Sequence, residues 1–188
     1  MRPVVIVDYD PSWPEQFAAE SDALLALLDG RLDGIHHIGS TAVPGLAAKP
    51  KIDMDAVLRD ERFVPEAIEL VRETGAYDFH GDPYGDRRWT FTRGHTHGIR
   101  LYLCGPGNRA HLQRILFRDW LRTHSADAAA YEALKRQLAL AAGGDWDFYT
   151  GGKADFVAGI IERATGRDRP DERIGLRTGP APREGDRK

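Results

Sequence analysis

The sequence lacks the features of a disulfide-bonded or membrane-spanning protein. Cys104 is the only cysteine among 188 residues, which excludes an intramolecular disulfide and a zinc site built from cysteines. No apolar run is long enough to span a bilayer, and the N-terminus turns acidic too early for a signal peptide. We therefore expect a cytoplasmic protein.

Basic charge and glycine-rich phosphate motifs are also scarce. The net charge is −3, which argues against general nucleic-acid binding through a basic face. Neither Gly-x-x-x-x-Gly-Lys-Ser/Thr nor Gly-x-Gly-x-x-Gly occurs, so the P-loop and the dinucleotide-binding fingerprint are absent. With 41% hydrophobic and 29% charged residues, the composition is that of a globular domain.

The chain divides into a domain over residues 1–166 and a polar tail over 167–188. The tail is rich in Arg, Asp, Gly and Pro, with seven basic residues against five acidic ones. It has too few apolar residues to offset the entropy of ordering, so we expect it to be disordered. A basic arm for an acidic partner is the alternative.

Periodicity predicts a mixed sheet followed by a helical second half. The helix over 109–124 carries Leu112, Ile115, Leu116 and Leu121 as its apolar face. This order of elements predicts an α+β or α/β domain rather than a doubly wound nucleotide fold. The expected strands lie at 4–7, 34–38, 51–58, 77–79, 88–92 and 99–103, and the expected helices at about 14–28, 64–74, 109–124, from 126 onward and 153–165.

Asp53 and Asp55 are the residues whose pattern points most directly to chemistry. Two residues apart on a strand, they face the same side and repel each other unless a cation lies between them. Mg²⁺ (or Mn²⁺) suits such a pair, because it prefers one or two carboxylates together with phosphate oxygens and water. The alternative is a solvent-facing strand with two ordinary acids.

The Gly39-Ser40 turn upstream favours the metal interpretation. A Gly-Ser turn exposes backbone N–H groups and a hydroxyl that together can hold phosphate oxygens. This order of residues matches the nucleotidyltransferase motif: an apolar residue and Gly-Ser, then about ten residues, then Asp-x-Asp in an apolar strand. A plain strand-to-helix turn is the alternative.

A longer block resembles the signature of the GrpB family. It runs over residues 37–53 as HIGSTAVPGLAAKPKID, and the resemblance extends from near the N-terminus to about residue 164. The resemblance implies a nucleotidyltransferase-like α+β fold, with a mixed sheet, flanking helices and a helical C-terminal half. A related domain is fused to dephospho-coenzyme A kinase in some bacteria. Further matching segments are YDPSW at 9–13, FRDWLR at 117–122, YEALK at 131–135 and YTGGK at 149–153.

The resemblance also implies roles for the motif residues. Gly39, Ser40 and Thr41 would contact a triphosphate, while Asp53 and Asp55 would bind the metal ions and act as the catalytic pair.

One departure from the superfamily pattern matters. A third carboxylate usually comes from a later strand, but the strand at 99–103 has no acidic residue. The base then comes from Asp86, His95 or His97, or the site has two carboxylates only, or transfer has been lost.

The other candidate ligand groups are basic. Lys49, Arg88, Arg100 and Lys153 are the cations expected near phosphates, and ordinary surface charge is the alternative for each. His95 and His97 have the spacing for one strand face, but no third convergent ligand supports a zinc hydrolase.

Three functions follow from these patterns. The first is metal-dependent transfer of a nucleoside monophosphate from an NTP to a small-molecule acceptor. The second is a nucleotide- or coenzyme-binding module of the same fold without turnover, which the missing third carboxylate favours. The third is an ATP-dependent ligase that acts through an adenylated acid.

Overall fold

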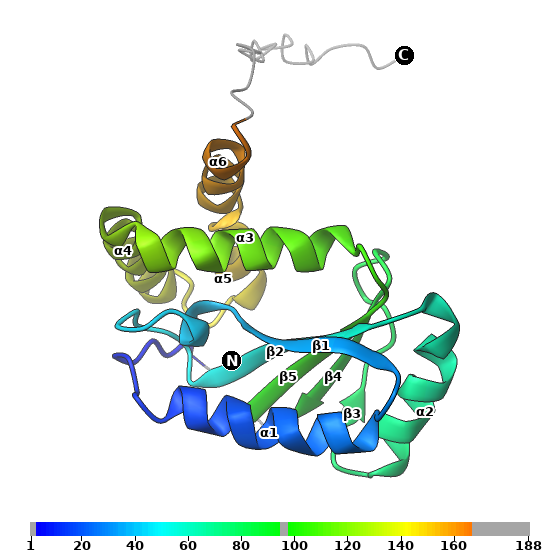
Figure 1. Cartoon of the computed structure of the whole chain (residues 1–188). Helices are drawn as coiled ribbons and strands as arrows, with labels where there is room; N and C mark the ends of the chain where they lie inside the picture. The colour runs from blue at the N-terminus through cyan, green and yellow to red at the C-terminus, as the bar shows by residue number, and fades with distance from the viewer. Residues whose placement is uncertain (1–2, 95–97, 167–188) are drawn as a thin grey trace, which may run out of the picture.

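A five-stranded mixed β-sheet forms the centre of the computed structural model, which describes residues 3–94 and 98–166 (Figure 1). The strand order is β1-β2-β5-β4-β3. β2 and β5 run parallel, and the other neighbouring strands are antiparallel. The strands are β1 (Leu32–Ile38), β2 (Lys51–Leu58), β3 (Asp78–Phe79), β4 (Arg88–Arg93) and β5 (Gly98–Cys104).

Helices cover both faces of this sheet. α1 (Trp13–Leu27) and α2 (Val64–Glu73) pack on one face, and α3 (Arg109–Thr123) crosses the other (Figure 1). The chain ends in α4 (Ser125–Ala141), α5 (Trp146–Gly151) and α6 (Ala154–Thr165), and two 3-10 turns, η1 (Ser40–Ala42) and η2 (Glu61–Phe63), follow β1 and β2. The α+β class with a helical C-terminal half is confirmed.

The alternation of side chains along β2 separates an apolar from a polar sheet face. Ile52, Met54 and Ala56 are almost fully buried against α1 and α2, in one cluster with Leu101 and Leu103 of β5. Burying each large side chain of this kind stabilises the fold by about 1.5–3 kcal/mol. This cluster is the main core and fixes the sheet on the α1 side.

The opposite face of the same strands is polar. Asp53 lies opposite Arg100 in the register of β2 and β5, and Asp55 lies opposite Tyr102. Cross-strand partners point to the same side of a sheet, so these four side chains share the face that α3 crosses. Arg100 therefore lies on the same face of the sheet as the two aspartates.

Three details differ from the sequence-based expectations. The predicted strand at 4–7 is wrong, since only Val7 forms an isolated bridge, with Ala48. Leu112 is 55% exposed, so the predicted apolar face of α3 is wrong at that position. α5 was not anticipated as a helix of its own; the Asp145 side chain caps it by accepting from two backbone N–H groups.

Other expectations fall on residues outside the structural description. His95, His97 and the tail at 167–188 lie outside the described residues. In the ranges that are described, no helix has the length and apolar character needed to cross a membrane.

Candidate functional site

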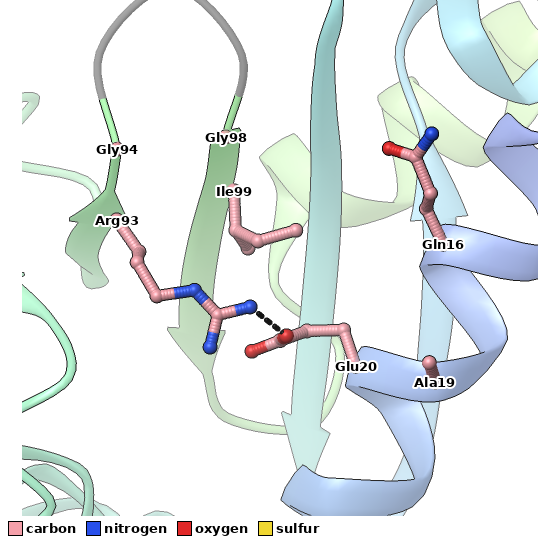
Figure 2. A pocket seen from close by; sticks show the side chains of 7 residues that line it. All are labelled: Gln16, Ala19, Glu20, Arg93, Gly94, Gly98 and Ile99. Atoms are coloured by element: carbon pink, nitrogen blue, oxygen red, sulfur yellow. Dashed lines mark hydrogen bonds and ion pairs between the residues drawn. The ribbon is translucent and has the colours of Figure 1, made fainter.

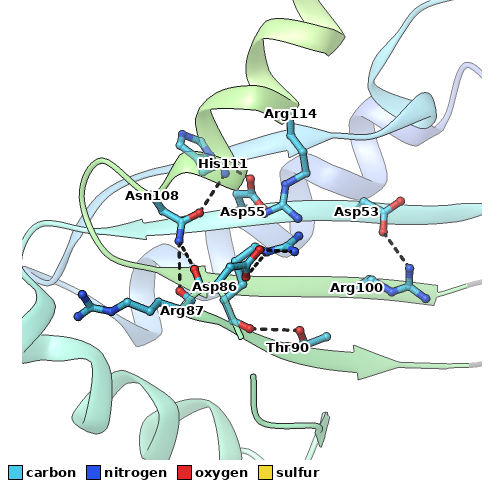
Figure 3. Close-up of polar contacts among 10 residues, drawn as sticks. Asp53, Asp55, Asp86, Arg87, Thr90, Arg100, Asn108, His111 and Arg114 are labelled. Carbon is cyan, nitrogen blue, oxygen red and sulfur yellow. Dashed lines mark hydrogen bonds and ion pairs between the residues drawn. The ribbon is translucent and has the colours of Figure 1, made fainter. Parts of the chain in front are cut away.

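Asp55 lies completely buried beneath α3 and is held by two side chains of that helix. His111 Nδ1 donates a hydrogen bond of 2.9 Å to Oδ2, and Arg114 Nη2 lies 2.8 Å from Oδ1 (Figure 3). The Arg114 contact is an ion pair whose atoms are not aligned for a hydrogen bond. Both oxygens of Asp55 therefore face protein cations or donors rather than solvent.

The start of α3 explains how these two side chains reach β2. Asn108 caps the helix by accepting from the His111 backbone N–H, and its amide donates 2.9 Å to the carbonyl of Asp86 (Figure 3). His111 and Arg114 are three residues apart and so lie on the same side of the helix. The cap thus ties the helix start to the loop before β4 and aims both residues at Asp55.

Further along α3, two more arginines bind backbone carbonyls, one in β1 and one in η1. Arg118 Nη1 donates a hydrogen bond of 2.8 Å to the carbonyl of His37. Arg122 donates two hydrogen bonds to the carbonyl of Ala42, one from Nε (2.9 Å) and one from Nη2 (2.7 Å). The FRDWLR segment that resembles the GrpB family thereby connects α3 to the end of β1 and to η1. α3 docks on this face largely through charged side chains.

Asp53 has a different environment from its neighbour. Its side chain is 29% exposed, and Oδ1 lies 4.0 Å from Arg100 Nη1 (Figure 3). Gly39 lies against its other side: a Cβ built on Gly39 would come within 2.9 Å of Oδ2, and its φ is +72°. Only glycine combines that backbone conformation with so close an approach at little cost.

Three lysines join Arg100 around this carboxylate. Burial, followed by repulsion from Lys153, lowers the pKa of Lys49 to about 8. Burial is also the largest cause of the lowered pKa values of Lys51 and Lys153, Arg100 lowers both further, and the charge of Asp53 opposes these shifts. We call Lys49, Lys51, Arg100 and Lys153 the Asp53 cluster; it sets four cations against one carboxylate.

The buried ring of Tyr149 supports two of these lysines. The Nζ atoms of Lys49 and Lys153 lie 5.0 Å and 4.2 Å from its centroid, distances at which a ring face attracts an ammonium group. Lys49 Nζ also lies 4.7 Å from the centroid of Trp146. α5 therefore positions the lysines from the side of the cluster that the sheet does not cover.

The described residues do not fit a resident divalent cation held by both carboxylates. The oxygens of Asp55 are taken by Arg114 and His111, and Asp53 is surrounded by cations that would repel a metal ion. No group of three or more His, Cys, Asp or Glu side chains in the described ranges is arranged to hold a metal ion. Binding of Mg²⁺ or Mn²⁺ by Asp53 and Asp55 stays a prediction.

α4 fixes the loop that joins the two halves of the motif. Glu132 Oε2 accepts from the backbone N–H of Ala47 (3.0 Å), and Lys135 Nζ donates to the carbonyl of the same residue. The side chain of Tyr131 hydrogen-bonds that of Ser40. The YEALK segment thus binds both backbone polar groups of Ala47, two residues before Lys49.

Some predicted phosphate ligands lie outside the Asp53 cluster. The Thr41 hydroxyl is buried and contacts His37 Nε2 at 3.0 Å, so it serves the interior of the protein. Arg88 pairs with Asp86 at 2.6 Å and lies opposite Cys104 in the register, whereas Arg100 lies opposite Asp53. The structure brings five of the predicted residues to Asp53 or to the turn beside it: Gly39, Ser40, Lys49, Arg100 and Lys153. The side chains of Thr41 and Arg88 have other partners.

A separate hollow of about 370 Å³ lies beside α1, at the end of the sheet where β4 and β5 are joined (Figure 2). Gln16 and Glu20 of α1 line one side and Arg93 and Ile99 the other, with Arg93 reaching across to pair with Glu20. None of the predicted site residues in the described ranges lines it.

The family relationship can now be stated. The sequence profile of the family described as GrpB protein matches residues 3–163. The chain belongs to the GrpB family. This confirms the resemblance on which the expectation of a nucleotidyltransferase-like fold rests, and the match stops before the polar tail.

Individual GrpB-family relatives agree with this assignment. A UPF0157 protein of Pseudomonas aeruginosa is 36% identical over 168 residues, which cover 86% of this chain and 67% of that protein. UPF0157 protein YqkA of Bacillus subtilis is 34% identical over 166 residues, 87% of this chain and 48% of that protein, so the chain spans about half of that relative. The crystal structure of GrpB from Enterococcus faecalis superposes with a TM-score of 0.78 at 30% identity, covering 87% of this chain and 98% of that one.

Four residues of the site were missed from sequence. His111 and Arg114 were missed because their helix was expected to bury a leucine face, whereas the sheet face beneath it is polar. Lys51 is the first residue of β2, and nothing in the sequence pattern distinguished it from an ordinary surface lysine. Trp146 lies in α5, which was not anticipated.

Replacing the two aspartates separates their roles. Asp55→Asn should lower the free energy of unfolding by about 3–5 kcal/mol, because it leaves Arg114 buried without its charge partner. Asp53→Asn should change it by less than about 1 kcal/mol, because that side chain is partly exposed and its ion pair is long. Urea unfolding of both variants measures the difference, and equal losses would contradict this assignment.

Lys135 should leave a signature in the pH dependence of stability. Burial lowers its pKa from 10.5 to about 7, so between pH 7 and 10 the unfolded chain binds a proton there that the folded protein does not. Stability therefore rises with pH across this window. Lys135→Met should reduce that rise by up to about 1.4 kcal/mol per pH unit in urea titrations. Arg72→Met, an exposed position on α2, is the control and should leave the slope unchanged.

Proposed function

We propose that this domain binds a phosphorylated ligand, a nucleoside triphosphate or a coenzyme-type phosphate ester, at the Asp53 cluster. The observation that carries the proposal is the division of labour between the two aspartates. Both carboxylate oxygens of Asp55 are paired with His111 and Arg114. Asp53 is therefore the one of the two aspartates that faces the four cations. This geometry favours the binding-module hypothesis.

The electrostatics of the cluster favour an anion. Like charges that share a site destabilise one another, as the influence of Lys153 and Arg100 on the pKa of Lys49 illustrates. A polyphosphate would relieve this repulsion and accept charge-assisted hydrogen bonds from lysine and arginine together. A single carboxylate cannot neutralise four cations, so a net positive charge is left for a ligand.

The Gly39-Ser40 turn adds polar backbone to the same place. Gly39 packs against the Asp53 carboxylate, and Gly39 and Ser40 are only half-buried. η1 begins at Ser40, so the turn offers N–H groups near the cations, which is an arrangement that suits phosphate oxygens. GrpB-family membership supports the proposal, since the motif residues belong to the block that the family profile matches.

Binding should be measurable without any metal ion. Isothermal titration with tripolyphosphate and ATP in EDTA should show saturable binding that weakens as salt rises. Arg100→Gln and Lys153→Gln should each weaken it about tenfold, whereas Arg72→Gln, on the opposite side of the sheet, should have no effect. Failure of ATP, coenzyme A and tripolyphosphate alike to bind the wild-type protein would refute the proposal.

The affinity should also depend on pH in a defined direction. Lys49 loses its proton as pH rises through about 8, so tripolyphosphate should bind progressively more weakly between pH 7 and 9. Lys49→Arg should flatten this dependence, because a guanidinium stays charged throughout. A steep pH dependence that survives in Lys49→Arg would assign the titration to another group.

Nucleotidyl transfer is the second candidate. It is favoured by the position of Asp53, a partly exposed carboxylate in contact with the Gly39 turn that the superfamily motif requires. Incubation with Mg²⁺ or Mn²⁺, each NTP and a pool of small acceptors should then release pyrophosphate, and Asp53→Asn should abolish the release. AMP formation only when an acid and an amine are both present would indicate the ligase instead.

A further inference from the structure

Trp146 is a large aromatic side chain exposed at the rim of the Asp53 cluster. Its residue is 43% exposed, although Lys49 Nζ lies 4.7 Å from its ring centroid. The cap by Asp145, whose carboxylate accepts from the N–H groups of Asp147 and Phe148 at 3.0 Å and 2.9 Å, fixes the start of α5 around it. The indole is thus held beside a phosphate-binding candidate at a partly exposed position.

We propose that Trp146 is the stacking platform for the planar base of a nucleotide whose phosphates occupy the Asp53 cluster. This rests on the proposed function and narrows its ligand class. A nucleotide carries a flat, weakly polar ring one sugar away from a polyanion, so its binding site needs an aromatic surface close to a group of cations. Sugar phosphates and inorganic phosphates have no part that would use the indole.

The arrangement of the neighbouring aromatic residues supports this choice. Tyr149 is buried and its ring is already covered by Lys49 and Lys153, so it supports the cations from within. The exposed ring of Tyr84 lies against Arg88, 4.2 Å from the guanidinium carbon to the ring centroid, rather than against a cation of the cluster, although its phenol group contributes to the raised pKa of Arg100. Trp146 is the exposed aromatic side chain, within the described part of the chain, that contacts a cation of the cluster.

Phe148 supplies a matched control on the same short helix. It is 49% exposed, close to the value for Trp146. Two residues along an α-helix turn a side chain by about 200°, so Phe148 points away from the direction of Trp146. Replacing it removes a similar amount of exposed aromatic surface from α5 without touching Lys49.

Titration calorimetry of ATP and tripolyphosphate in EDTA tests the proposal. Stacking a base on an aromatic side chain contributes enough that wild-type protein should bind ATP about tenfold more tightly than tripolyphosphate. Trp146→Ala should remove that advantage by weakening ATP binding about tenfold more than it weakens tripolyphosphate binding, whereas Trp146→Phe should retain part of the advantage. Phe148→Ala should behave as wild type with both ligands. Circular dichroism confirms that each variant is folded.

Fluorescence gives an independent measurement. The chain has four tryptophans, and the contribution of Trp146 to the emission is the part that is lost in Trp146→Phe. ATP should quench this part of the emission, and tripolyphosphate should not. Equal affinities of the wild-type protein for ATP and tripolyphosphate would overturn this inference and leave the phosphate site intact. An equal loss of both ligands in Trp146→Ala would also overturn it, because the indole would then act by positioning Lys49. Binding of neither ligand would overturn both proposals.

Discussion

The buried contact between Asp55 and α3 is the constraint on which the rest of the structure depends. One face of the sheet is closed by ordinary apolar packing, but the other carries charges that α3 must satisfy. A buried carboxylate without partners would be strongly unfavourable, and Arg114 and His111 supply those partners. This contact sets where α3 lies, and α3 in turn determines where α4 and α6 pack.

A consequence is that two aspartates with the same spacing and strand have opposite characters. Asp55 is a structural anchor, and Asp53 is the one negative charge in a positive site. The difference comes from what covers each residue, since the helix lies over one and leaves the other near the lysines. The Asp-x-Asp pattern therefore puts both carboxylates on one face of the sheet without giving them the same environment.

The sequence predicts much of the sheet because β2 alternates clearly, with Ile52 and Met54 on the core face and the aspartates on the other. The Gly39-Ser40 turn was recognised from its place between a short strand and the Asp-x-Asp strand, and Arg100 was expected near phosphates as a cation on a neighbouring strand. His111 and Arg114 could not be found this way. Their role depends on which helix crosses the polar face, which is decided by tertiary packing rather than by local periodicity.

The contacts between α4 and Ala47 have a consequence for local unfolding of the domain. Glu132 and Lys135, three residues apart on one helical turn, bind the backbone N–H and the backbone carbonyl of Ala47. Local unfolding of that turn would release both contacts at once, and with them the segment that leads to Lys49. The loop and α4 therefore form one cooperative unit, in which the binding geometry persists only as long as a helix distant in sequence remains wound.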